Sequence, residues 1–197
     1  MSDSDHLSVA KSSTDAKATG LGVAGDMNSS SVASQDKTQA YVGNNSRVTA
    51  GRQVDVTASD KTQLDLEVVG AAGGAVGIGA AVGVGITHST TEAFVGSSTA
   101  VDAAGDVSIT AAAGNLNATG SRVRSTAGAG GVIGVSAAVS VLKDSSTTRA
   151  YVGSNASIER ADALLVSAET DRRASATTIG AAAGGLAIGA SVASATF

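Results

Sequence analysis

Apolar and polar residues alternate one by one in several short stretches of the chain. In RQVDVTA, Val54 and Val56 alternate with polar residues, and in DVSIT the pair Val107 and Ile109 repeats the arrangement. A period of two is typical of a β-strand with one buried face, and β-branched residues favour strands. The pattern therefore predicts strands whose Val54, Val56, Val107 and Ile109 point into the core.

A longer stretch without polar side chains, GAAGGAVGIGAAVGVGI at residues 70–86, follows the same period. One parity holds Val76, Ile78, Ala80, Val82, Val84 and Ile86, and the other holds Gly77, Gly79, Ala81, Gly83 and Gly85. Two later copies, at residues 133–141 and 186–192, keep the alternation. Glycine within a strand costs about 0.5–1 kcal/mol relative to alanine, which something must offset. We predict a strand whose branched face fills the core and whose glycine face packs closely against another sheet, backbone or subunit.

A membrane-spanning helix is the competing interpretation of this stretch. The glycine pairs at 73/77 and 79/83 have the spacing of packed transmembrane helices. Against it, the stretch is marginal in length for a spanning helix. Lys143 in the second copy and the polar counterpart GLGVAGDMNSSSVA near Gly20 would also fit a bilayer badly. We therefore expect a strand and no membrane insertion.

Three phrases recur along the chain in a fixed order. The first is TQAYVG, TEAFVG and TRAYVG, which begins at Thr38, Thr91 and Thr148, at spacings of 53 and 57 residues. VDVTA, VSITA and LLVSA keep these spacings, whereas the glycine-rich phrase has them in the opposite order. The middle copy therefore carries four extra residues, and GNLN is the expected lengthened turn.

These anchors divide the chain into units. We expect residues 1–37 to be a partial or degenerate repeat, residues 38–90 repeat 1, residues 91–147 repeat 2, and residues 148–197 an incomplete repeat 3. Together they would form one continuous repeat domain. Because the chain starts and stops inside a repeat, we expect a fragment of a longer array.

Composition limits both the core and the partners. The chain has 25 glycines, no proline, cysteine or tryptophan, and four phenylalanine or tyrosine residues, so Val, Ile, Leu and Ala must form the core. It is 43% hydrophobic with a net charge of −4, which favours an ordered structure and argues against nucleic-acid binding. The basic pairs Arg122/Arg124 and Arg172/Arg173 are interpreted as solvated strand or turn positions.

Few residues suggest catalysis or ligand binding. The histidines, His6 and His88, lie in unrelated phrases, and His88 is expected to be a solvated turn residue. Without cysteine or a paired base, an activated nucleophile is not predicted. Asp102 and Asp106 are weak candidates for a metal site, but they lack the ligand density of a calcium loop. We therefore predict no enzyme activity, no cofactor and no metal.

The pattern T-x-A-[YF]-V-G-S-S-x-x-V-x-A-x-G-D-V-x-I-x-A of residues 91–111, followed by a Gly/Ala-rich strand, resembles the repeats of giant bacterial surface and secreted adhesins. The filamentous-haemagglutinin-like and leukotoxin-like repeat arrays are the nearest families, and the resemblance covers residues 38–197. It implies an all-β β-solenoid, specifically a right-handed parallel β-helix, located outside the bacterial cell or on its surface. Each repeat would make two or three coils. Tyr41, Phe94 and Tyr151 would stack or occupy matching surface positions.

Three hypotheses about function remain open at this stage. The first is a non-enzymatic adhesin or fibre segment that acts as spacer and interaction surface, with a host or bacterial surface receptor as partner. The second is a membrane-active toxin repeat, suggested by the leukotoxin-like resemblance. The third is self-assembly through the Gly/Ala-rich faces or through open strand edges.

Overall fold

The computed structural model describes the backbone of residues 2–197 and the surroundings of side chains from residue 12 onward. Every regular element in this range is a β-strand, which confirms the all-β prediction. The described residues therefore contain no helix, and no helical segment among them meets the length and apolarity needed to cross a membrane.

The strands form three sheets, named A, B and C here, and every strand pair is parallel. Sheet A contains β1 (Ser2–Thr19), β4 (Val54–Gly73), β7 (Val107–Asn115), β8 (Ser121–Gly130), β12 (Leu164–Asp171) and β13 (Ala174–Ala183). Sheet B contains β2 (Val23–Val42), β5 (Val76–Val95), β9 (Ile133–Asp144), β10 (Thr147–Val152) and β14 (Leu186–Thr196). Sheet C contains β3 (Arg47–Ala50), β6 (Ala100–Ala103) and β11 (Ser157–Arg160).

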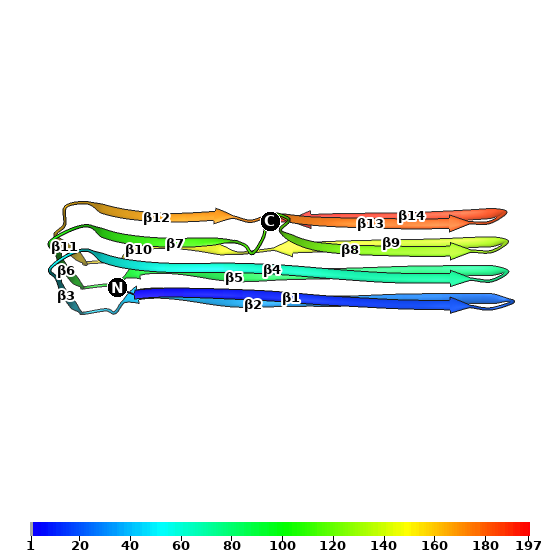
Figure 1. The fold of residues 1–197 in the computed structure, drawn as a ribbon, viewed down its shortest axis with the longest axis horizontal. Helices are drawn as coiled ribbons and strands as arrows, with labels where there is room; N and C mark the ends of the chain where they lie inside the picture. Colours follow the sequence, from blue (N-terminus) through cyan, green and yellow to red (C-terminus); the bar gives the residue numbers. More distant parts are fainter. Residues whose placement is uncertain (1) are drawn as a thin grey trace.

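The chain runs through the sheets in a fixed order, A, B and then C, before it returns to A (Figure 1). One such passage is called a circuit here. Each circuit lies beside the previous one in register, because Val54 pairs with Val107 in sheet A and Val48 pairs with Val101 in sheet C. One 53-residue repeat is therefore one circuit. The prediction of two or three coils per repeat is wrong, because the strands are up to 20 residues long and one pass uses up the repeat.

The repeat phrases fall at the ends of strands, because TQAYVG, TEAFVG and TRAYVG form the carboxyl ends of three sheet B strands and their final glycines begin the turns toward sheet C. Thr38, Thr91 and Thr148 lie inside β2, β5 and β10 and occupy one row across sheet B. The polar stretch after Gly20 does take the place of the glycine-rich phrase, since Val23 pairs with Val76 at the start of β2.

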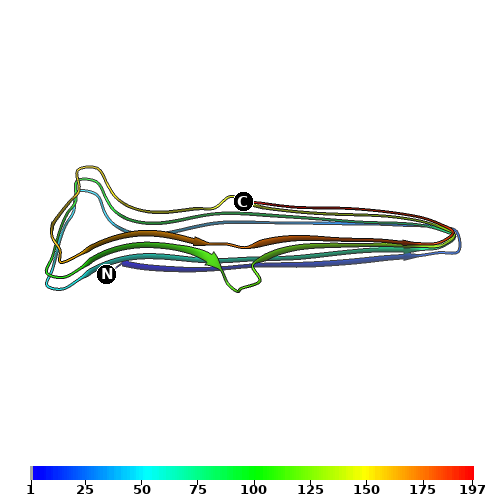
Figure 2. The same cartoon turned by 90° about the horizontal axis from the view of Figure 1, so that it is seen from above.

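The four extra residues of the middle repeat interrupt sheet A. β7 ends with Asn115 paired to Thr62, and β8 resumes with Arg122 paired to Asp65, so the register offset changes from 53 to 57 residues. The chain between these strands leaves the sheet as a loop (Figure 2). GNLN marks the start of this loop, as the sequence predicts.

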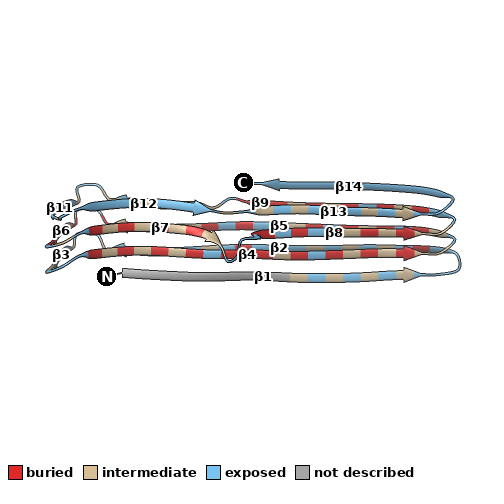
Figure 3. Ribbon diagram, turned by 45° about the horizontal axis from the view of Figure 1, so that its top comes forward, coloured by how far each residue is buried: buried red, intermediate tan, exposed pale blue. Residues whose placement is uncertain are grey.

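Sheets A and B face one another, and the interior between them changes character along the strands. Near sheet C, aliphatic residues from all three sheets form one core; it contains Ala40, Val54, Val56, Ala58, Ala93, Val95, Val101, Ala103, Val107, Ile109 and Ala111. A second core lies further along and contains Leu64, Leu66, Val68, Ala81, Val123, Ala127, Ala138 and Leu142. Buried Asp60, Thr62, Thr87, Ser89 and Asp144 lie between the cores. Figure 3 shows the alternation of buried and exposed positions that produces both cores.

At the end opposite sheet C, the two sheets converge on a tight reversal between β4 and β5 (Figure 2). Here Gly77, Gly79, Gly83 and Gly85 point inward and are buried. A Cβ atom on Gly77 would lie 2.5 Å from the carbonyl oxygen of Gly130 in sheet A, and one on Gly79 would overlap the carbonyl of Gly128. The expected close packing of the glycine face against another sheet is therefore present.

The branched residues of β5 face the opposite way from the prediction. Ile78, Val82 and Ile86 are exposed on the outer face of sheet B. The prediction that the branched face fills the core is wrong, because the inward positions of β5 are already met by the sheet A backbone at Gly77 and Gly79 and by core side chains at Gly83 and Gly85. The same geometry removes the glycine face as a surface for self-association, since it is already covered by sheet A.

Candidate functional site

An aromatic ladder crosses the outer face of sheet B close to sheet C. Tyr41, Phe94 and Tyr151 occupy one row, and their rings stack with centroid separations of 5.1 and 4.9 Å and interplanar angles of 8° and 2°. The ring faces are therefore turned toward one another, and Tyr41 and Tyr151 at the two ends of the ladder are 54% and 39% exposed. This arrangement joins successive circuits and leaves the central ring little face for a ligand.

A polar row lies beside the ladder. Gln39 Nε2 donates to Glu92 Oε2 at 2.5 Å, and Arg149 Nη1 lies 4.0 Å from Glu92 Oε1. These residues belong to three successive circuits, as the ladder rings do. The side chains on this part of sheet B therefore link the circuits to one another.

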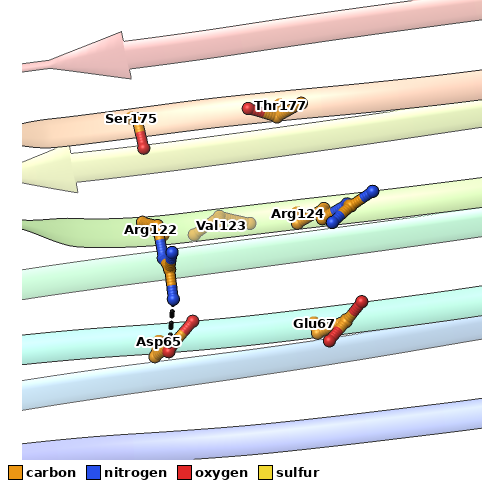
Figure 4. Close-up of a pocket in the computed structure, with 7 residues that line it drawn as sticks. All are labelled: Asp65, Glu67, Arg122, Val123, Arg124, Ser175 and Thr177. Carbon is orange, nitrogen blue, oxygen red and sulfur yellow. Dashed lines mark hydrogen bonds and ion pairs between the residues drawn. The ribbon is translucent and has the colours of Figure 1, made fainter. Parts of the chain in front are cut away.

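Charged side chains form two rows on the outer face of sheet A. Arg122 Nη2 donates to Asp65 Oδ2 at 3.0 Å, and Arg124 is paired in register with Glu67. Together with Ser175 and Thr177 of the next circuit they line a shallow hollow of about 250 Å³ (Figure 4). Arg122 and Arg124 are exposed strand residues, in agreement with their interpretation from the sequence. The hollow brings two acidic and two basic side chains together on the outer face of sheet A.

The second basic pair, Arg172/Arg173, is not fully exposed to solvent, contrary to the interpretation from the sequence. Arg173 is exposed, but the side chain of Arg172 is only 4% exposed and lies in the polar layer between the two cores. Its Nη2 atom donates to Asp60 Oδ2 at 2.7 Å and to Ser89 Oγ at 2.5 Å, and its Nη1 atom lies 3.5 Å from Asp144 Oδ2. The interpretation of Arg172 as a solvated residue is therefore wrong.

The loop of the middle repeat explains how Arg172 reaches this position. Arg172 lies between β12 and β13, and its partner Asp60 is 112 residues earlier, two circuits away. The intervening circuit is open there, because residues between β7 and β8 leave sheet A. Asn115 and Ser121 at the rims bond to the exposed backbone of β4, at Thr62 O and Leu64 N. Arg172 therefore fills an opening in the third circuit and bonds to the second.

The two weak metal candidates make separate contacts. Asp102 pairs with Arg160 at 2.8 Å, whereas the backbone carbonyl of Asp106 accepts from the amide of Val54. Among the residues that the structure describes, no group of three or more His, Asp or Glu side chains could hold a metal ion. His88 is exposed, with Nδ1 3.1 Å from Ser145 Oγ, but the prediction that it lies in a turn is wrong, because it belongs to β5; the side chain of His6 lies outside the described residues.

An uncharged apolar surface covers the outer face of sheet B near the reversal. Ile188 and Val192 are 53% and 59% exposed, and Ile78 is 45% exposed. The sequence shows the alternation that creates this surface but not which parity faces outward. The inward orientation of the glycines could be inferred only from the close approach of sheet A to sheet B.

Comparisons of the chain with protein-family models, curated proteins and solved structures find no match. The stacked sheets carry three surface features that could serve a function: the aromatic ladder, the charged rows and the apolar surface.

Proposed function

We propose that this chain is a structural, non-enzymatic segment of a large extracellular adhesin or fibre on the bacterial cell surface. The observation that carries the proposal is the in-register stacking of equivalent residues from successive repeats, as in the ladder of Tyr41, Phe94 and Tyr151. In such a stack each circuit satisfies the backbone hydrogen bonds of its neighbours, and stability comes from repetition. Surface proteins that resist mechanical force need this property more than they need a pocket.

The finer fold in this proposal is a β-solenoid, a parallel β-helix with one repeat per coil. Its support is that strands in each of sheets A, B and C have a parallel, in-register neighbour one repeat later. Connections between parallel strands of one sheet are right-handed in almost all proteins, which favours a right-handed helix.

The size of a circuit indicates what such a segment contributes. Neighbouring strands are about 4.8 Å apart, so a 53-residue repeat adds only about 4.8 Å along the stack, or roughly 0.1 Å per residue. The long strands instead provide width, because 20 residues of strand span about 66 Å. The segment therefore adds little length per residue but provides a broad surface. Binding to a partner is accordingly a more important part of its function than spacing.

Adhesive contact is assigned to the charged rows of sheet A. Arg122 and Arg124 are exposed beside Asp65 and Glu67, and polar side chains continue the rows into the next circuit. A receptor with polar or charged groups on a host or bacterial surface would fit such a mixed row.

Two experiments test the proposal. Arrays of four, eight and sixteen repeats, viewed by electron microscopy, should lengthen by about 4.8 Å per repeat at constant width. An increment near 15 Å would contradict one repeat per coil. Beads coated with the chain should adhere to epithelial or bacterial cells, and Arg122→Asp with Arg124→Asp should reduce adhesion. Equal binding by coated and uncoated beads would contradict the adhesive role.

Membrane activity is the second candidate, and the apolar surface of sheet B is the observation that favours it. A face without charge could enter the interfacial region of a bilayer. Release of a trapped dye from liposomes at low protein concentration would support this function, and retention of the dye would exclude it.

A further inference from the structure

The apolar surface of sheet B has sharp boundaries. It consists of the outward residues between the reversal and the row of Ile86, and it crosses β2, β5, β9 and β14. These residues are Val23, Gly25, Met27, Ser29, Ser31 and Ala33; Val76, Ile78, Ala80, Val82, Val84 and Ile86; Ile133, Val135, Ala137, Val139 and Val141; and Leu186, Ile188, Ala190, Val192 and Ser194. None of them is charged. The sixth row, that of Ile86, is completed by Lys143 and Thr196, so the surface has one charged side chain at its border, and the next row contains Gln35 and His88.

The area of this surface is that of a protein interface. Four strands about 4.8 Å apart and eleven residues of about 3.3 Å each cover roughly 700 Å². The largest apolar patch on a typical monomer is about 300–600 Å², whereas a stable interface buries about 600–1,000 Å² on each partner. The surface is therefore large enough for a stable dimer when it is covered completely.

The relief of the surface is complementary to itself. One row consists of Ala80, Ala137 and Ala190, and the adjacent row consists of Val82, Val139 and Val192. The first is a shallow groove and the second is a ridge, and both continue across three strands. In the first circuit the order of sizes is reversed, with Met27 in the alanine row and Ser29 in the valine row.

We infer that this surface binds a second copy of the chain, face to face, about a two-fold axis that runs between the alanine row and the valine row. This axis is parallel to the direction in which the circuits stack. It places the valine ridge of each copy over the alanine groove of the other, and Met27 over Ser29. The contact is isologous, as in most homodimers.

The position of the charges agrees with this arrangement. Six rows of residues lie in the surface, and the two-fold axis has three rows on each side. The row of Lys143 then lies over the row of Val76 next to the reversal, where the long lysine side chain reaches solvent at the rim. The interior of the contact holds no charge that would have to be desolvated. Each circuit contacts the equivalent circuit of the second copy, so every repeat with this pattern adds a similar strip to the interface.

Sedimentation of the intact 197-residue chain tests the inference. We expect a particle of twice the 18.8 kDa monomer mass at micromolar concentration. Val82→Lys should weaken the dimer by about 100-fold or more, because it places a charge in the middle of the contact. Thr57→Lys, an outward substitution on sheet A, should leave the dimer unchanged. Val82→Thr preserves shape and strand propensity and should weaken the dimer several-fold with no change in circular dichroism.

Cross-linking tests the placement of the axis, because the chain has no cysteine of its own. A mixture of Ala80→Cys and Val82→Cys chains should form a dimer with a short bismaleimide faster than either variant alone, and Thr57→Cys should form none. A wild-type chain that stays monomeric at millimolar concentration would overturn the inference. Equal dimerisation of Val82→Lys and wild type, or binding to phosphatidylcholine vesicles without any dimer, would overturn it as well.

Discussion

Replacing Arg172 with alanine is expected to lower the free energy of unfolding by about 3–5 kcal/mol, the usual loss when one partner of a buried ion pair is removed. The Arg172 side chain is 4% exposed, and the carboxylates of Asp60 and Asp144 are 1% and 8% exposed. Without the guanidinium group, both carboxylates stay buried with hydroxyl donors as their remaining side-chain partners. The variant therefore leaves negative charge in the interior without an opposite charge.

Thermal unfolding followed by circular dichroism measures this loss. For a chain of 197 residues, 3–5 kcal/mol corresponds to a decrease in Tm of about 7–12 °C. The neighbouring Arg173 provides a matched control, because its ion pair with Asp171 is exposed on both sides. Arg173→Ala should change the stability by about 0–1 kcal/mol.

A second variant separates the charge from the packing. Arg172→Met combined with Asp60→Asn and Asp144→Asn removes all three charges and keeps most of the volume, so it should be more stable than Arg172→Ala. Equal, small losses of unfolding free energy for Arg172→Ala and Arg173→Ala would refute the reasoning. They would mean that the buried ion pairs of Arg172 across the opening of the third circuit do not stabilise the fold.

Three further changes test other parts of the structure. Gly79→Val or Gly83→Val should destabilise the chain by about 3 kcal/mol or more, because the new side chains would meet sheet A. As controls, Ser97→Ala and Ser98→Ala should each cost about 1 kcal/mol or less. Equal effects of the glycine and serine variants in urea denaturation would contradict the inward glycine face. Phe94→Leu removes both stacked pairs and should cost about 1–3 kcal/mol by the same assay, and an unchanged midpoint would mean that the ladder adds nothing. Ser98 has a φ of 55°, which asparagine tolerates better, so Ser98→Asn should raise Tm by a few degrees, and a lower Tm would contradict strain at this turn.

The repeat pattern predicts much of the fold, because strand propensity and register both repeat with it. Val54 and Val107 share a phrase, both are buried, and they are paired in sheet A. The extra residues near GNLN are visible as a change of spacing and appear as a loop at that place. These features depend on local pattern and on identical offsets, which a sequence displays directly.

The direction of the side chains near the reversal could not be predicted in the same way. Alternation specifies that Gly79 and Val82 lie on opposite faces, but it does not specify which face is inside. That choice depends on the distance between sheets A and B, which is a property of the folded chain. The role of Arg172 was hidden for the same reason, because its partner Asp60 becomes close only after two circuits have stacked.

The outward branched residues cannot be explained by strand formation alone. Glycines on the inner face weaken the strand by about 0.5–1 kcal/mol each, and β-branched residues on the outer face offset part of this cost. Threonine would provide the same branching and remain compatible with water. In the second half of β5 the outward positions do include Thr90 and Glu92, so the strand accepts polar residues wherever it faces solvent. In the first half the same alternation places Ile78 and Val82 outward, with no charge in four adjacent strands. The difference within one strand is best accounted for by a partner that covers the first half, and a second copy of the same surface matches its size and its relief.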